Sequence, residues 1–103
     1  MINVSVMYPN TPGAQFDMPY YCATHIPLLR TLVGTALLAV VVEEGIAGLG
    51  SDLRPPFIAL GHLYFESVDS FQTAMGPHLA QIQADIPNYT NVEPTVQISR
   101  VKR

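Results

Sequence analysis

Apolar residues recur at strand spacing in some segments of the chain and at helical spacing in others. The order of these segments constrains the fold more than any other feature of the sequence. Every second residue from Ile2 to Tyr8 is apolar, which is the pattern of a strand with one buried face. Residues 21–32 carry apolar side chains at helical spacing, and residues 37–44 and 57–65 are again strand-like. A second helical stripe spans residues 71–82, and residues 92–101 supply a last strand. This order predicts an α+β, ferredoxin-like βαββαβ protomer: a four-stranded antiparallel sheet with both helices on one face.

Signals at the helix ends support this order. Asp17 and Ser67 each stand where a side-chain oxygen can cap the first turn of a helix. Pro27 is expected to kink the first helix, because it has no N–H to donate and crowds the preceding turn. Gly76-Pro77 is expected to kink the second helix or to split it in two.

The composition bears on what covers the sheet face that the helices leave bare. Hydrophobic residues make up 49 % of the 103 residues and charged residues only 13 %, about half the charged share usual in soluble proteins. A chain of this length forms one domain, residues 1–103. We therefore expect most of the excess apolar surface on the bare face, where a homodimer would cover it, and a smaller share in a pocket near His25.

The charge and the apolar segments exclude several classes of protein. A formal net charge of −3 without basic clusters argues against nucleic-acid binding, since phosphates are neutralised by Lys and Arg. The longest charge-free apolar stretch, residues 31–42, is shorter than the ~20 residues that cross a bilayer. The first residues lack the basic start and apolar core of a signal peptide, and the single Cys22 allows no internal disulfide. We expect a soluble cytoplasmic protein with no membrane partner.

His25 is the first candidate for chemistry. It follows Tyr21 by four residues on the same helical face and precedes Pro27 by two, where a kink leaves room for a ligand. An imidazole in that position could act as a general acid or base near neutral pH. The alternative is a histidine that hydrogen-bonds the backbone and supports the kink.

Two further histidines have polar neighbours. His62 and Tyr64 share one strand face, roughly 7 Å apart at ~3.3 Å per residue, and could both bind a ligand held against the sheet. They could equally satisfy each other across a dimer contact or through water. His78 lies on the second helical stripe, and Asp85 follows on the same side and could orient it as a base. The simpler interpretation, which we favour, is that Asp85 caps and turns the chain locally.

Other patterns favour no metal and no cofactor. The three histidines lie on different elements without metal-ligand spacing. Cys22 precedes His25 by three residues, but nothing in the sequence supplies the positive neighbour that a reactive thiolate needs. The glycines of residues 45–50 stand in the reverse order of a dinucleotide fingerprint, and no helix follows, so this segment is expected to be a flexible loop.

The chain resembles the EthD family of dimeric α/β-barrel proteins, which is named from an ethyl tert-butyl ether degradation cluster. The resemblance rests on residues 20–28 (YYCATHIPL), which match the family's Tyr-x3-His-x-Pro-Leu helix, and on residues 62–67 (HLYFES) and 85–90 (DIPNYT). It implies a homodimer whose two sheets close a barrel, and it places His25 at the family's most recurrent polar position. The wider superfamily includes cofactor-free monooxygenases, polyketide cyclases, lactone isomerases and haem enzymes, and no histidine here lies in a recognisable haem-ligand context.

These patterns lead to a functional hypothesis with two alternatives. We expect a small homodimeric enzyme without an obligatory cofactor that oxygenates, cyclises or isomerises an apolar or aromatic, oxygenated small molecule. His25 would be its acid–base group, and Tyr64 or Tyr89 would donate a hydrogen bond to a developing oxyanion. The side chains expected to contact the substrate are Tyr21, His62, His78 and Tyr89. The alternatives are a non-catalytic ligand-binding or accessory dimer in a degradative pathway, and a structural dimer of the stress type.

Overall fold

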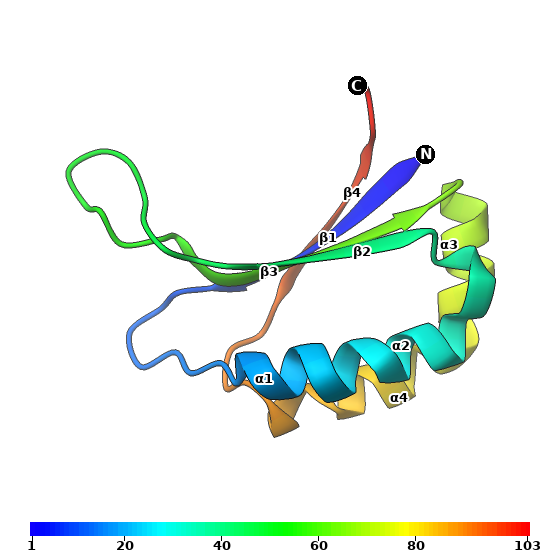
Figure 1. Cartoon of the computed structure of the whole chain (residues 1–103), viewed down its shortest axis with the longest axis horizontal. Coiled ribbons are helices and arrows are strands. Elements are labelled where there is room, and N and C mark those ends of the chain that lie inside the picture. Colours follow the sequence, from blue (N-terminus) through cyan, green and yellow to red (C-terminus); the bar gives the residue numbers. More distant parts are fainter.

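The structure, a computed structural model, describes residues 1–103 and contains one antiparallel sheet with its helices on a single face (Figure 1). The strands are β1 (Ile2–Pro9), β2 (Ala39–Glu44), β3 (Phe57–Phe65) and β4 (Thr95–Arg100), in the order β2-β3-β1-β4. The helices are α1 (Met18–Tyr20), α2 (Ile26–Val33), α3 (Val68–Met75) and α4 (Leu79–Ala84). Every neighbouring pair of strands is antiparallel. The predicted α+β, ferredoxin-like βαββαβ protomer is confirmed.

The first helical segment runs from α1 into α2 through a π-helical turn, Tyr21–His25. It begins as predicted, because Asp17 accepts a hydrogen bond from the backbone N–H of Tyr20 at 3.0 Å. The irregularity expected at Pro27 lies just before it, as the π-helical turn. A locally wider helix relieves the conflict between the proline ring and the preceding turn. The turn leaves both Tyr21 and His25 buried against the sheet.

The second helical segment is split where the sequence predicts a break. Ser67 caps α3 by accepting a hydrogen bond from the backbone N–H of Ser70 at 3.0 Å. A 3-10 turn, Gly76–His78, then separates α3 from α4. The resulting helices are short, and none has the length and apolar character needed to span a bilayer.

The core between sheet and helices has an aliphatic part and an aromatic part. The aliphatic part joins β1, α2, β3 and the second helical segment, and its largest buried ring is Phe65. The aromatic part is built around Tyr8, Tyr21 and Tyr89, with Ile26 and Ala59 packed against them. The rings meet mostly edge to face, for example Tyr8 and Tyr21 with centroids 5.7 Å apart, an arrangement that favours aromatic pairs.

The other face of the sheet is open and of mixed character. Met7 and Leu60 are paired across β1 and β3 and give this face an apolar band, which ends at Glu43 of β2, the residue paired with Leu60. His62 and Ser5, also paired across β1 and β3, lie beside this band and are polar. The face is therefore less uniformly apolar than the composition led us to expect.

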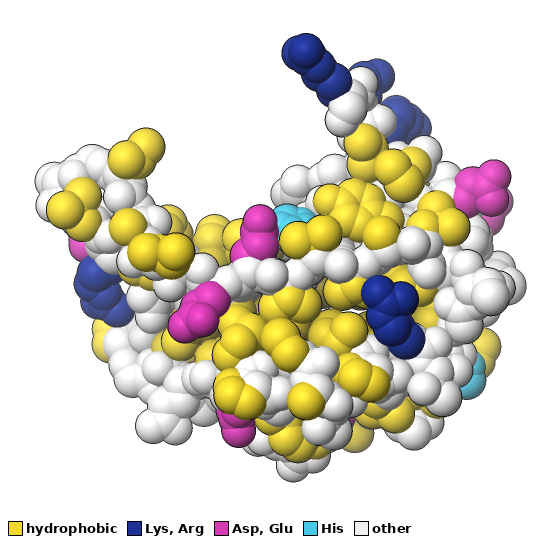
Figure 2. Space-filling model, viewed as in Figure 1, with side chains coloured by type: hydrophobic (Ala, Val, Ile, Leu, Met, Phe, Trp, Pro, Cys, Tyr) yellow, Lys and Arg dark blue, Asp and Glu magenta, His cyan; other side chains and the backbone are white.

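Part of the apolar excess lies instead in the loop of residues 45–56, between β2 and β3. This loop rises beyond the sheet on the side of its open face (Figure 1), and hydrophobic side chains are visible on it in Figure 2. Ile46, Leu49 and Leu53 are 91 %, 99 % and 66 % exposed. Composition alone could not show whether the excess apolar residues lie in this loop or on the sheet face.

The close approach of Tyr21 to β3 provides a test of this packing. A Cβ atom at Gly61 would overlap the Tyr21 hydroxyl oxygen. We expect Gly61→Ala to lower the free energy of unfolding by about 1–3 kcal/mol, as overpacking of a core does, measured by urea denaturation. Gly76→Ala is the control, because a Cβ there meets nothing within 4 Å. An unchanged Gly61→Ala protein would show that Tyr21 does not pack against β3.

Candidate functional site

A small cavity of about 130 Å³ lies between the sheet and the helical segments. Its wall is mostly apolar and comes from β1, α2, β3 and the second helical segment. The imidazole of His25 reaches this wall together with the buried tyrosines Tyr8, Tyr21 and Tyr89. Leu79 and Val96 also line the cavity and are 43 % and 54 % exposed, so it opens to solvent between α4 and β4.

His25 is held by a carboxylate from the far end of the chain. Its Nδ1 lies 2.8 Å from Oδ2 of Asp85, and the two side chains are 5 % and 12 % exposed. An ionised carboxylate can only accept hydrogen bonds, so the neutral imidazole carries its proton on Nδ1. The lone pair of His25 is therefore on Nε2, which is free to accept a proton.

Asp85 is kept ionised by three donors. Its Oδ1 accepts hydrogen bonds from the Tyr20 hydroxyl at 2.7 Å and from Nδ2 of Asn88 at 2.9 Å, while Oδ2 faces His25. Partial burial acts to raise the pKa of Asp85, but the hydrogen bonds from Asn88, His25 and Tyr20 outweigh it and leave the pKa below its usual value. The same contact with Asp85 raises the pKa of Tyr20.

The tyrosines continue the network on the other side of His25. The Tyr89 hydroxyl lies 3.5 Å from Nε2 of His25 and 2.7 Å from the Tyr8 hydroxyl. The ring of Tyr21 stacks on the imidazole, with centroids 5.4 Å apart and an angle of 14° between the planes. Burial raises the pKa of Tyr8, Tyr21 and Tyr89, so these hydroxyls stay protonated and can act as hydrogen-bond donors.

This arrangement is suited to proton transfer at an apolar cavity. An imidazole whose second nitrogen is bonded to a carboxylate is fixed in orientation and tautomer, and its protonated form is stabilised. A tyrosine hydroxyl near the base can stabilise an oxyanion as it forms. Both His25 and Tyr89 are buried, which strengthens both interactions.

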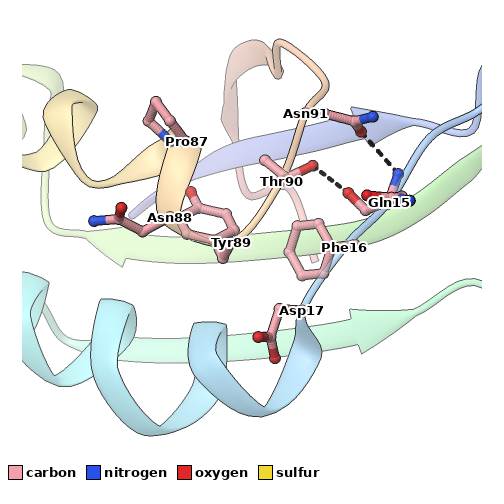
Figure 3. A pocket seen from close by; sticks show the side chains of 8 residues that line it. All are labelled: Gln15, Phe16, Asp17, Pro87, Asn88, Tyr89, Thr90 and Asn91. Carbon is pink, nitrogen blue, oxygen red and sulfur yellow. Dashed lines mark hydrogen bonds between the residues drawn. The ribbon is translucent and has the colours of Figure 1, made fainter.

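A shallow groove of about 390 Å³ lies where residues 15–17 meet residues 87–91 (Figure 3). Its polar atoms are largely bonded to each other: Gln15 N–H donates to Asn91 Oδ1 at 2.8 Å, and Thr90 Oγ1 donates to the Gln15 carbonyl at 2.7 Å. The Asp17 N–H donates to the Tyr89 carbonyl at 2.7 Å. These contacts tie the chain that enters α1 to the segment that carries Tyr89, and so they fix the position of Tyr89 at the cavity.

The structure brings some of the residues predicted from the sequence together and separates others. His25, Tyr21 and Tyr89 meet at the cavity. His62 and Tyr64 lie on the open face of the sheet, where His62 contacts Glu43 through Nε2 at 2.8 Å. The wall of the cavity does not include His78. No group of three or more His, Cys, Asp or Glu side chains is arranged to hold a metal ion.

Three residues of the network were missed or placed differently by sequence reasoning. Asp85 does bond locally to Asn88, as we favoured, but it also binds His25 across 60 positions of sequence, and His78 is not its partner. Tyr8 could have been found, because it ends the inward-facing alternation of β1. Tyr20 carries no such signal, since it lies beside the helical stripe that contains His25.

The fold and the site together define a class of protein: a ferredoxin-like α+β protomer with a histidine–carboxylate pair at an apolar cavity. The chain belongs to the EthD family, because the model of that family, the EthD domain, matches residues 13–93. No curated protein matches the chain.

The chain is similar over nearly its whole length to solved structures, two of which are the following. An EthD-like protein from Ralstonia eutropha JMP134 is 43 % identical, with a TM-score of 0.91, over 99 % of this chain and 94 % of that one. An ethyl tert-butyl ether degradation (EthD) family protein from Bacillus halodurans C-125 is 20 % identical, with a TM-score of 0.66, over 98 % of both chains. The Ralstonia protein is similar to this chain in both sequence and fold, whereas the Bacillus protein is similar in fold alone.

The network around Asp85 predicts a pH-dependent part of the stability. Because the pKa of Asp85 is lowered in the folded state, its contribution is fully present above the unfolded-state pKa of about 3.9 and is lost as the pH falls through the lower folded-state value. We expect Asp85→Asn to be less stable than the wild-type protein at neutral pH and to show a shallower loss of stability below about pH 4. Urea unfolding at a series of pH values measures both.

Glu66→Gln is the control, because it removes an exposed carboxylate that makes no hydrogen bond. We expect its unfolding midpoint to follow that of the wild-type protein at every pH. If Asp85→Asn did the same, the three hydrogen bonds to Asp85 would contribute nothing to folding.

Proposed function

We propose that this EthD-family protein is a cofactor-independent enzyme that binds a small, largely apolar molecule with an oxygen function and removes a proton from it. The observation that carries the proposal is the placement of His25. Its Nδ1 is held by Asp85 at 2.8 Å, which leaves Nε2 as the basic nitrogen, and the residue lines an apolar cavity. One fixed base in such a cavity is sufficient for proton abstraction.

The proposed reaction begins when Nε2 of His25 takes a proton from a hydroxyl, or from a carbon next to a carbonyl. The resulting imidazolium is stabilised by the carboxylate of Asp85, and the negative charge that forms on the ligand oxygen is stabilised by the Tyr89 hydroxyl. An enolate or phenolate formed in this way is the common starting point for oxygenation, cyclisation and isomerisation. We therefore propose this class of reaction, with His25 as the base.

Tyr89 is better placed than Tyr64 to stabilise the oxyanion. The Tyr89 hydroxyl is 3.5 Å from the base and is 3 % exposed as a residue. Tyr64 is on β3 with its side chain on the opposite face of the sheet, where it pairs in register with Asn3. A single protomer therefore supplies Tyr89 to the cavity and keeps Tyr64 away from it.

We also propose that two copies associate through the open face of the sheet, as cytoplasmic homodimers. The apolar band of Met7 and Leu60, with Val41 in the neighbouring row, supports this, since apolar surface at the centre of a sheet face is stabilised when a second sheet covers it. The two copies of that face would meet about a two-fold axis. The helices and the cavity would then lie on the outer side of each protomer.

Catalysis is tested with deuterium exchange, which detects proton abstraction without knowledge of the final product. The wild-type protein is incubated in D2O with one-ring enolisable ketones, and deuterium incorporation at carbon is followed by NMR. We expect His25→Ala to slow the exchange by about 100-fold or more, the usual contribution of a general base. Cys22→Ser is the control, because Cys22 lies on the same helical segment with its thiol exposed.

The outcomes of this experiment separate the enzyme from an accessory binding protein. Full exchange by His25→Ala would rule out His25 as the base. A wild-type protein that binds the ketones and exchanges none of them would instead favour the non-catalytic ligand-binding alternative, which needs the cavity and not the base.

The dimer is tested with a charge in the apolar band. We expect the wild-type protein to sediment as a dimer and Leu60→Lys to sediment as a monomer, because an ammonium group buried between two sheets is strongly destabilising. Val68→Lys is the control, since Val68 is 40 % exposed at the start of α3, away from the open face. If Leu60→Lys remains a dimer, the contact lies elsewhere.

A further inference from the structure

One contact in the hydrogen-bond network at the cavity is long, and it is made by His25, the proposed general base. The Tyr8–Tyr89, His25–Asp85 and Tyr20–Asp85 contacts measure 2.7, 2.8 and 2.7 Å. The contact between Tyr89 and Nε2 of His25 measures 3.5 Å, which is at the limit of a hydrogen bond. The two polar groups that line the cavity side by side are therefore only weakly bonded to each other.

The directions of the hydrogen bonds follow from the fixed end of the network. Asp85 requires the proton of His25 on Nδ1, so Nε2 is an acceptor. The Tyr89 hydroxyl can then donate toward Nε2, and in that arrangement the proton between Tyr8 and Tyr89, which either oxygen could donate, comes from Tyr8. The cavity therefore offers a ligand one acceptor, Nε2 of His25, next to one donor, the hydroxyl of Tyr89.

A hydroxyl group matches this pair of sites, and other oxygen functions do not. A ligand O–H can donate to Nε2 of His25 while its oxygen accepts from Tyr89. A ketone or an ether oxygen can accept from Tyr89 but leaves Nε2 without a donor, which weakens its binding without preventing it, so enolisable ketones at high concentration remain usable probes of proton abstraction. The hydrogen bonds thus select a ligand that both donates and accepts through the same atom.

The remaining wall limits the size and polarity of the ligand. The volume of about 130 Å³ is close to that of a cavity of roughly 150 Å³ that holds one benzene molecule. The side chains away from the network include Val4, Leu29 and Leu63, which cannot pair with a second polar group, and the other polar side chain of the wall, Gln83, is solvent-exposed. A single six-membered ring fits this space, and a fused multi-ring system does not.

We propose that the ligand of this cavity is a monocyclic phenol or an enol of similar size, bound with its hydroxyl between Nε2 of His25 and the hydroxyl of Tyr89. This rests on the proposed function and specifies its substrate class. On proton transfer the ligand O–H bond breaks and its electron pair stays on the oxygen. An N–H bond forms at Nε2, and the positive imidazolium faces Asp85 while the oxyanion keeps the hydrogen bond from Tyr89.

The test measures the binding of three probes by ¹⁹F NMR: 4-fluorophenol, 4-fluoroanisole and 4-fluorotoluene. The anisole has an oxygen that accepts and cannot donate, and the toluene has none. With the wild-type protein we expect 4-fluorophenol to bind more tightly than 4-fluoroanisole by about tenfold, the effect of one buried hydrogen bond. This comparison uses only the wild-type protein, so it does not depend on how a variant folds.

A double-mutant cycle between ligand and protein then isolates the Tyr89 contact. Dividing the dissociation constant of 4-fluorotoluene by that of 4-fluorophenol cancels the hydrophobic contribution that both probes share. We expect Tyr89→Phe to lower this ratio by about tenfold, and Cys22→Ser to leave it unchanged. Circular dichroism confirms that both variants are folded.

The results separate the failure of this proposal from the failure of the proposed function. If 4-fluoroanisole binds as tightly as 4-fluorophenol, or if Tyr89→Phe leaves the ratio unchanged, the selection for a hydroxyl is wrong, while deuterium exchange by His25 still tests the enzyme. If none of the three probes binds, the cavity is not a ligand site, and both proposals fail.

Discussion

The hydrogen bond between Nδ1 of His25 and Oδ2 of Asp85 is the interaction on which the site depends. It measures 2.8 Å and joins the first helical segment to the end of α4, across 60 positions of sequence. It determines which nitrogen of His25 carries the proton, and hence that Nε2 is the one available at the cavity. Because Nε2 is an acceptor, the Tyr89 hydroxyl, which also contacts the Tyr8 hydroxyl, is the donor in the contact between Tyr89 and His25. Without Asp85 the imidazole could adopt either tautomer, and the cavity would have no defined acceptor.

The backbone places His25 where this bond can form. Pro27 cannot donate an N–H to the preceding turn, and the helix widens into the π-helical turn that ends at His25. Tyr21 begins the same turn, and its ring lies flat against the imidazole. The absence of a side chain at Gly61 leaves room on β3 for the Tyr21 hydroxyl. A proline on one element and a glycine on another thus position one histidine.

Sequence patterns predicted what depends on neighbours in the chain and failed where the partner is distant. The order of strands and helices along the chain, the caps at Asp17 and Ser67 and the break at Gly76–His78 depend on local sequence, and the structure contains all of them. The partner of Asp85 is distant: a short polar side chain at a helix end bonds locally in most proteins, and nothing along the chain reveals a contact with His25. The placement of Tyr64 is an intermediate case. The alternation along β3 put Ala59, Leu63 and Phe65 on one face and Tyr64 on the other, and the helices cover the more apolar face.

The cavity itself is an argument for a ligand. Apolar space of about 130 Å³, if it were enclosed, would destabilise a fold by roughly 3 kcal/mol at about 24 cal/mol per Å³, and the opening to solvent makes the cost here smaller. Even part of that value matters against the 5–15 kcal/mol by which small domains are usually stable. Larger side chains at Val4, Val6 or Leu63 would fill the space, and they would also block the approach to His25. A protein of 103 residues that leaves this volume open beside an oriented base recovers the lost contacts only when a molecule of matching size enters. The size of the space and the donor and acceptor at its wall therefore describe the same molecule: one ring with one hydroxyl group.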